Sequence, residues 1–241
     1  MTSQQDAPQG AIGFAVGATV AGALVAVLAL GYAQVALPAQ PLLSDYALVS
    51  GGLVPVLAGM LALAGACLTL AYGLAVREPG RTAATRVLLL AAAAGLMMSA
   101  VFPTDPGGSE IDTLTGEIHR WAAAVVFTTL PVAGWTLTRG REARPRWNAV
   151  RALSVTSVVA LAVYLAAHPA SFTSAWMDGA AYYGLLERAL VVAEIALIVA
   201  MAVAAGRRTG AVRAQAPAPA AEPADPGNQG ESAERGARLV A

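Results

Sequence analysis

The sequence predicts an all-α fold, a polytopic transmembrane bundle of six helices with both termini in the cytoplasm. The first observation behind this is composition: 57% of the 241 residues are hydrophobic and only 12% are charged, whereas soluble domains carry about 25% charged residues. The second is a series of six long apolar segments. The third is the sorting of the arginines between alternate loops. A mean hydropathy of +0.60 agrees with burial of most of the chain in lipid.

Six apolar segments are long enough to cross a bilayer as helices. A helix rises about 1.5 Å per residue, so about 20 residues cover a hydrocarbon core of about 30 Å. We expect a transmembrane domain over residues 11–208, between a disordered segment at 1–10 and a disordered tail at 209–241, whose Ala- and Pro-rich composition cannot bury a core. The expected helices are residues 11–37, 53–76, 83–102, 116–137, 150–167 and 180–205.

The first helix is expected to be retained, because no basic residue precedes it and it exceeds the length of a signal-peptide core. Its Gly13 and Gly17, extended by Ala21, have the spacing that lets a second helix approach closely. Pro38 ends this helix. The second helix tolerates Pro55 because the residue lies in its first turn.

The third helix is expected to stop at Phe102, because Pro103 disfavours helical geometry in the residue before it. The fourth begins near Gly116 and ends before the arginine-rich segment 139–147. The fifth ends at His168, again before a proline. The sixth is closed by a pair of arginines, so each predicted helix has a recognisable end in the sequence.

All fifteen basic residues are arginines, and those in the loops of the apolar domain occur in every second loop. Arginines follow the second, fourth and sixth helices and are absent from the loops after the first, third and fifth. Because cytoplasmic loops are enriched in positive charge, this pattern predicts that both termini are cytoplasmic. The loops without arginine, which carry several acidic residues, then lie at the outer face.

The stretch from Phe102 to Ala122 is the most polar part of the apolar domain, with four carboxylates, a histidine and an arginine. A charged residue at the centre of a membrane span costs about 2.5–3.5 kcal/mol, so its presence there calls for a structural or functional explanation. Together with charges early in the sixth helix, this stretch supplies the predicted ligand-binding residues. These are Asp105, Glu117, His119, Arg120, Glu187 and Arg188.

Glu194 is the deepest charged residue, about midway along the sixth helix. It shares a helix face with Glu187, about 10 Å away along the axis. We expect it to be protonated or to face polar groups such as Thr128, Thr129, Ser154 or Ser157. It is a candidate proton-relay group, since acids inside the membrane are functional candidates.

Three arrangements of these charges remain open. In a structural network, Glu187 pairs with Arg120, and Arg188 pairs with Glu117. In the second arrangement, the same residues line a polar pocket open to the outer leaflet. In the third, they are exposed to water at the interface. A paired network can also line a pocket, so the first two are compatible.

A metal site is not favoured. His119, His168, Asp105 and Asp112 are expected at the outer side, but no pair of ligands has a local metal-binding spacing. Cys67 is a lone cysteine in an apolar run and cannot form an internal disulfide. We therefore expect no cofactor and no metal. A net charge of zero gives no reason to expect nucleic-acid binding.

Three motifs resemble the domain of unknown function 998 family. They are Phe102-Pro103-Thr104-Asp105-Pro106 with Gly116-x-Ile118-His119, and Gly184-Leu185-x-Glu187-Arg188 in the last helix. The resemblance covers about residues 10–208. It implies a small bacterial membrane protein with six helices, located in the plasma membrane, and gives no biochemical activity. A fainter similarity to eukaryotic membrane proteins of the Frag/DRAM/Sfk type suggests lipid handling.

Three functions fit the sequence. The first is binding of a lipid headgroup or small polar ligand in a pocket between the third, fourth and sixth helices. The second is an intramembrane lipid hydrolase or transferase, with His119 as base or metal ligand and Asp105 as metal ligand or orienting acid. The third is a proton-coupled transporter that uses Glu194 and Glu187. Membrane lipids are the expected partners in each case; the oligomeric state is left open.

Overall fold

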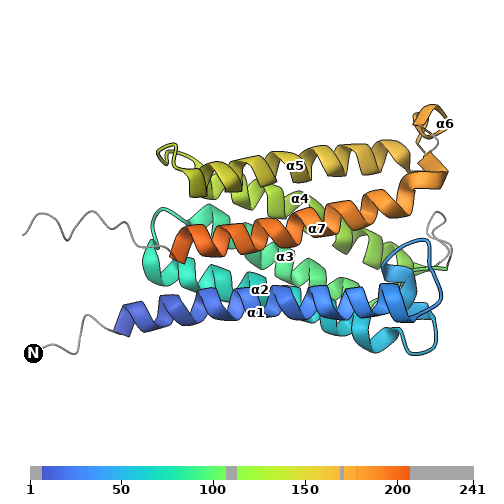
Figure 1. The fold of residues 1–241 in the computed structure, drawn as a ribbon, viewed down its shortest axis with the longest axis horizontal. Helices are drawn as coiled ribbons and strands as arrows, with labels where there is room; N and C mark the ends of the chain where they lie inside the picture. Colours follow the sequence, from blue (N-terminus) through green and yellow to red (C-terminus); the bar gives the residue numbers. More distant parts are fainter. Residues whose placement is uncertain (1–6, 107–112, 169–170, 178, 207–241) are drawn as a thin grey trace, which may run out of the picture. The chain divides into compact units, whose positions relative to one another are not determined.

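The chain forms six long helices that pack side by side, joined by short loops (Figure 1). This computed structural model describes residues 7–106, 113–168, 171–177 and 179–206. All six long helices are long and apolar enough to cross a membrane, which confirms the predicted number of spans. Two short helical turns, η1 and α6, were not predicted. The elements are α1 (Ala7–Ala36), η1 (Ser44–Leu48), α2 (Leu53–Arg77), α3 (Ala83–Val101), α4 (Leu114–Thr138), α5 (Pro145–Ala167), α6 (Ser174–Met177) and α7 (Gly179–Gly206).

Several helices begin earlier than predicted. Helix α1 begins at Ala7, within the segment expected to be disordered, while residues 1–6 lie outside the described part of the chain. Helix α5 begins at Pro145 rather than residue 150, because proline suits the first helical position, where its missing N–H costs no bond. Helix α4 begins at Leu114, with the side chain of Thr113 as its N-cap. The predicted disordered tail at 209–241 lies outside the described residues.

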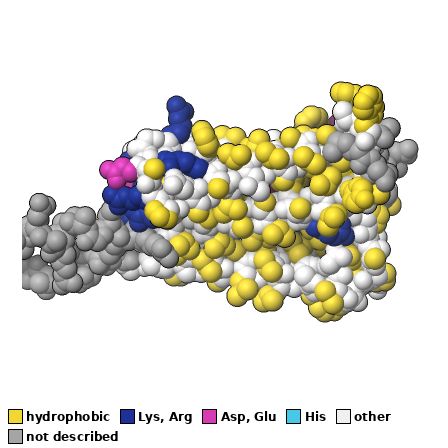
Figure 2. All heavy atoms as spheres, turned by 45° about the horizontal axis from the view of Figure 1, so that its top comes forward, with side chains coloured by type: hydrophobic (Ala, Val, Ile, Leu, Met, Phe, Trp, Pro, Cys, Tyr) yellow, Lys and Arg dark blue, Asp and Glu magenta, His cyan; other side chains and the backbone are white. Residues whose placement is uncertain are grey.

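Consecutive long helices pack against each other, and α7 closes the bundle by packing between α5 and α1. Helix α7 also contacts α4 and α2, which makes it the most central helix. Its residues Leu190, Leu197, Ile198 and Met201 are fully buried. The sides of the bundle carry exposed apolar side chains (Figure 2), as expected of a surface that contacts lipid.

Most of the basic side chains visible in Figure 2 gather at one end of the bundle, where they bind the loops to each other. Arg81 donates to the carbonyl oxygens of Arg139 at 3.3 Å and Gly140 at 2.8 Å. Arg141 forms an ion pair with Glu78 at 2.7 Å. These contacts bring the α2–α3 and α4–α5 loops together. The opposite end of the bundle is formed by η1 and the starts of α4 and α7, and we call it the polar end.

Helices α1 and α2 approach closely through small residues, but not through the predicted pair. A side chain on Gly13 or Gly17 would meet nothing within 4 Å, whereas one on Gly22 would come within 2.8 Å of the Ala62 carbonyl oxygen. Thr19 adds a hydrogen bond to Thr69 across this contact, at 3.0 Å. The predicted glycine pair thus lies on an exposed side of α1.

Candidate functional site

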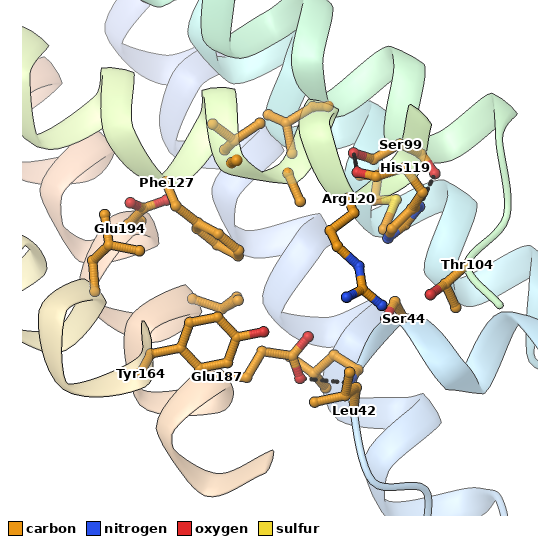
Figure 3. A pocket seen from close by; sticks show the side chains of 18 of the residues that line it. Leu42, Ser44, Ser99, Thr104, His119, Arg120, Phe127, Tyr164, Glu187 and Glu194 are labelled. Atoms are coloured by element: carbon orange, nitrogen blue, oxygen red, sulfur yellow. Dashed lines mark hydrogen bonds between the residues drawn. The ribbon is translucent and has the colours of Figure 1, made fainter. Parts of the chain in front are cut away.

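A cavity of about 520 Å³ lies inside the bundle and is lined by residues of all six long helices and of η1 (Figure 3). Most lining residues are apolar. Of the polar ones, all but two come from the polar end, while Thr128 and Glu194 lie deeper. The polar-end residues are Ser44, Ser99, Thr104, Glu117, His119, Arg120, Tyr164, His168, Tyr183 and Glu187. The cavity is therefore polar at one end and largely apolar below it.

The cavity reaches the lipid-facing surface between α4 and α5. Trp121 and Leu165 both line it, and they are 68% and 55% exposed. Thr128, another lining residue, is also exposed. Residues that belong to both the cavity wall and the outer surface mark its rim. The rim lies on two helices that are long and apolar enough to cross a membrane.

His119 is buried in the cavity wall with a defined orientation. Its Nδ1 lies 3.0 Å from the carbonyl oxygen of Ser99 and 2.9 Å from that of Phe102. Carbonyl oxygens only accept hydrogen bonds, so Nδ1 must carry the proton. In the neutral ring this leaves Nε2 as an acceptor for a ligand in the cavity.

Glu187 is also buried, and it is held by a backbone group. Its Oε2 accepts a hydrogen bond from the Leu43 N–H at 2.7 Å. The predicted pair with Arg120 is not among the ion pairs of the described residues. The carboxylate instead joins α7 to the segment before η1, where a short turn presents a backbone donor.

Arg188 lies outside the cavity lining, contrary to its predicted place in the pocket. It donates to Gln34 Oε1 at 2.8 Å and to the carbonyl oxygens of Gln40, Pro41 and Gly184 at 2.9, 2.8 and 2.7 Å. The guanidinium group of Arg188 thus donates to these four acceptors. The predicted ion pair with Glu117 is not formed in the described structure. Arg188 thus fastens α7 to the end of α1.

Arg120 is the arginine that lines the cavity, and it reaches from α4 toward Ser44 (Figure 3). A cluster of aromatic side chains from α5 and α7 also lines the cavity. The Tyr164 and Tyr183 rings stack at 4.5 Å, and the Tyr183 hydroxyl donates to that of Tyr164 at 2.6 Å. His168 meets Tyr183 edge-on. Burial and the charge of Arg120 both lower the pKa of His168, which favours its neutral form.

Asp105 is buried but does not line the cavity. Its two oxygens accept from the Thr113 hydroxyl at 2.7 Å and the Thr113 N–H at 3.2 Å. A side chain on Gly116 would collide with the Asp105 carboxyl. Asp105 therefore holds the start of α4 in place. Asp112, which was weighed with it as a metal ligand, lies outside the described residues.

Asp45 is a buried acid at the polar end that the sequence analysis did not single out. Its Oδ2 accepts from the Leu42 N–H at 3.2 Å, while Oδ1 has no partner among the described residues. Burial raises the pKa of Asp45, against smaller opposing effects of the Leu42 hydrogen bond, His119 and Arg188. Asp45 lies in the short turn η1, which is too short for a periodic pattern to mark a residue as buried, so only its charge could have drawn attention to it.

Glu194 is 3% exposed and lines the deep part of the cavity. Its Oε1 has no hydrogen-bond partner among the described residues. Of the polar groups expected to face it, Thr128 and Thr129 donate to carbonyl oxygens of α4, and Ser154 donates to one of α5. The fourth, the buried hydroxyl of Ser157, has no hydrogen-bond partner among the described residues. Figure 3 shows Glu194 at the opposite end of the pocket from Arg120 and His119.

Six membrane-spanning helices around a partly polar cavity define an α-helical multi-pass membrane protein. Within the described residues, no group of three or more His, Cys, Asp or Glu side chains could hold a metal ion. The chain belongs to the family described as protein of unknown function DUF998, whose model matches residues 15–204. This confirms the resemblance seen in its motifs. No curated protein and no solved structure matches the chain.

Proposed function

We propose that this protein binds an amphipathic molecule, such as a lipid, that enters the cavity from the bilayer. The observation that carries the proposal is the division of the cavity into a polar end and an apolar remainder, with a rim on the lipid-facing surface. Its volume falls in the range of about 300–1,000 Å³ typical of small-molecule sites. A headgroup would lie near Arg120 and His119, and the apolar part would extend along α4 and α7.

The polar end of the cavity faces the outside of the cell in this proposal. This orientation is supported by the arginine-rich loops at the opposite end of the bundle, because positively charged loops stay in the cytoplasm. Both termini are then cytoplasmic, and the membrane is the plasma membrane of a bacterium. Arg120 supplies hydrogen-bond donors in a fixed plane, which suits phosphate or carboxylate groups. His119 Nε2 and Glu187 accept hydrogen bonds from hydroxyl or amine groups.

Native mass spectrometry of the protein, released gently from its own membrane, tests this function. We expect a bound amphiphile in the parent protein. The adduct should be lost in Arg120→Gln and in Ala123→Trp, which fills the cavity without a charge change. It should remain in Arg144→Gln, at the opposite end of the bundle. A parent protein without an adduct, or an adduct equally retained in all variants, would contradict the proposal.

A hydrolase that uses His119 and Asp105 together has less support. Asp105 holds Thr113, and the ring nitrogen of His119 that would face an orienting acid is bonded to two carbonyl oxygens. Proton-coupled transport is favoured by one observation, the buried and unpartnered oxygen of Glu194. Uptake driven by a pH gradient and lost in Glu194→Gln would support it.

A further inference from the structure

One face of α7 carries the residues that line the cavity, and Glu194 is the deepest polar one. Tyr183, Glu187, Val191, Glu194 and Ile198 follow each other at intervals of three or four residues, so they lie on one side of the helix. Glu194 is two turns below Glu187, and the residues that flank it on this face are apolar. Its carboxyl therefore points into a largely apolar chamber.

The ionisable groups that line the cavity are acidic on balance. Helix α4 contributes Glu117, His119 and Arg120, helix α5 contributes Tyr164 and ends at His168, and helix α7 contributes Tyr183, Glu187 and Glu194. The lining residues from α1, α2 and α3 are apolar apart from Ser99. Three carboxyl groups thus face one arginine, and the histidines are neutral or positive. Away from Arg120, such a lining favours a positively charged group of the ligand over a negatively charged one.

A bare carboxylate in apolar surroundings is costly in free energy, so Glu194 needs a proton or a cation beside it. The oxygen without a partner leaves room for either. Aromatic rings in the same wall also attract cations through their electron-rich faces. Phe127 and Tyr164 meet edge-on at 6.4 Å, and both line the cavity.

We propose that Glu194 forms a deep subsite for lipophilic organic cations, such as apolar ammonium or phosphonium compounds dissolved in the membrane. The proposal rests on the cavity being a ligand site, and it names the class of ligand. The apolar groups of the ligand contact the leucine and isoleucine side chains, and its positive centre pairs with Glu194. Any hydrogen-bonding group of the ligand lies toward Arg120 and His119.

Binding exchanges one cation for one proton. The protonated Glu194 loses its O–H proton to water as the cation enters, and the carboxylate that remains pairs with the cation. Charge within the cavity is then unchanged. Because the proton competes with the ligand, affinity should rise with pH. The groups that could share this proton are Glu187 on the same face, His119 on α4 and His168 at the end of α5.

The test uses the whole protein in lipid nanodiscs without anionic lipid, with tritiated tetraphenylphosphonium as the probe. This compound is a permanent lipophilic cation without hydrogen-bond donors, so it reports on charge and apolar contact alone. We expect saturable binding that neutral triphenylphosphine oxide does not displace. Glu194→Gln should lower the affinity by about ten- to hundredfold, the range for losing an interaction with a charged group. Glu142→Gln, an exposed acid at the other end, is the matched control.

Two further measurements keep the test independent of how well Glu194→Gln folds. A pH-sensitive dye should record about one proton released per cation bound to the parent protein, and Glu194→Asp should keep the binding that Glu194→Gln loses. Saturable binding with no proton release, or with equal affinity in Glu194→Gln, would overturn the cation subsite. A parent protein that retains an amphiphile but does not bind the probe would also overturn it, while leaving the proposed function in place. A parent protein that neither retains an amphiphile nor binds the probe would contradict both proposals.

Discussion

Backbone groups at helix ends hold most of the polar side chains at the polar end of the bundle. Glu187 accepts from a backbone N–H, while His119 and Arg188 donate to backbone carbonyl oxygens. Helix ends leave such donors and acceptors unpaired, and lipid offers them no partner. Arg120 and Glu194 line the cavity from its two ends, and the ligand experiments concentrate on these two residues.

Asp105 is predicted to stabilise the fold rather than to contact a ligand. Asp105→Ala removes the acceptors of the Thr113 N–H and hydroxyl, which should lower the free energy of unfolding by about 1–3 kcal/mol. Thermal unfolding of the purified protein in detergent measures this loss, with Glu142→Ala as the exposed control. Native mass spectra of the folded fraction should still show the amphiphile. Unchanged stability with a lost adduct would instead place Asp105 in the ligand site.

Asp45 is predicted to destabilise the protein increasingly as pH rises. Its folded-state pKa is raised above the ordinary value of 3.8 by burial, so between these two values the folded state holds a proton that the unfolded state has lost. The stability is fully present below the lower value and falls as pH rises through the folded-state value. Asp45→Asn should therefore raise the melting temperature more at about pH 7 than at about pH 4. A variant that is less stable at neutral pH would show that His119 and Arg188 outweigh burial.

The residues of the candidate site could be predicted from the sequence better than their contacts. Charge within apolar segments was enough to select His119, Arg120, Glu187 and Glu194, which all line the cavity. Their partners were not predictable by pairing opposite charges, because the backbone groups that bind them belong to helix ends far away in sequence. Tyr164 was missed, since an aromatic residue in an apolar span carries no signal of its own.

At the scale of helices, the contact between α1 and α2 depends on small side chains rather than on hydrophobicity. The buried face of α1 carries Ala15, Thr19, Gly22 and Ala26. In a bilayer the outward face is as apolar as the inward one, so a hydrophobic period cannot show which side is buried. This is why the spacing of Gly13 and Gly17 pointed to the wrong face, although the helix itself was predicted.

Gly22 and Gly17 offer a matched pair of substitutions that tests this contact. Gly22→Val should lower the free energy of unfolding by about 1–3 kcal/mol, because its side chain would press on the Ala62 carbonyl and on Ala66. Gly17→Val should have little effect, since nothing lies within 4 Å of the added group. Melting temperatures of the two variants in the same detergent measure the difference. Equal losses would mean that α1 packs through another face.

The number of helices was predictable because bilayer thickness sets the length of a membrane span. The ends of most helices also lie close to their predicted positions. The two short elements were not predictable. Ser44–Leu48 and Ser174–Met177 are each shorter than the window over which a helical period can be recognised. Both lie at the polar end, and η1 contributes Ser44 to the cavity. The irregular part of the fold is thus also the part that shapes the candidate site.

At the scale of the whole molecule, the arrangement of charge predicts which end faces the cytoplasm. The arginines of the α2–α3 and α4–α5 loops meet at one end. Arg81 of the first loop donates to carbonyl oxygens of the second, and Arg141 of the second pairs with the Glu78 carboxylate of the first. The positive-inside rule counts short loops of this kind. The polar end of the cavity is then on the outer side, where a ligand arriving in the outer leaflet would first meet Arg120 and His119.

Cysteine labelling of intact bacterial cells tests this orientation. The only native cysteine, Cys67, is buried and can be replaced by alanine to give a background without thiols. In that background, Ala39→Cys at the polar end should react with a membrane-impermeant maleimide added outside. Gly80→Cys, in the arginine-rich loop, should react only after the cells are opened. The reverse pattern would place the polar end in the cytoplasm, and the ligand of the cavity would then have to come from the inner leaflet.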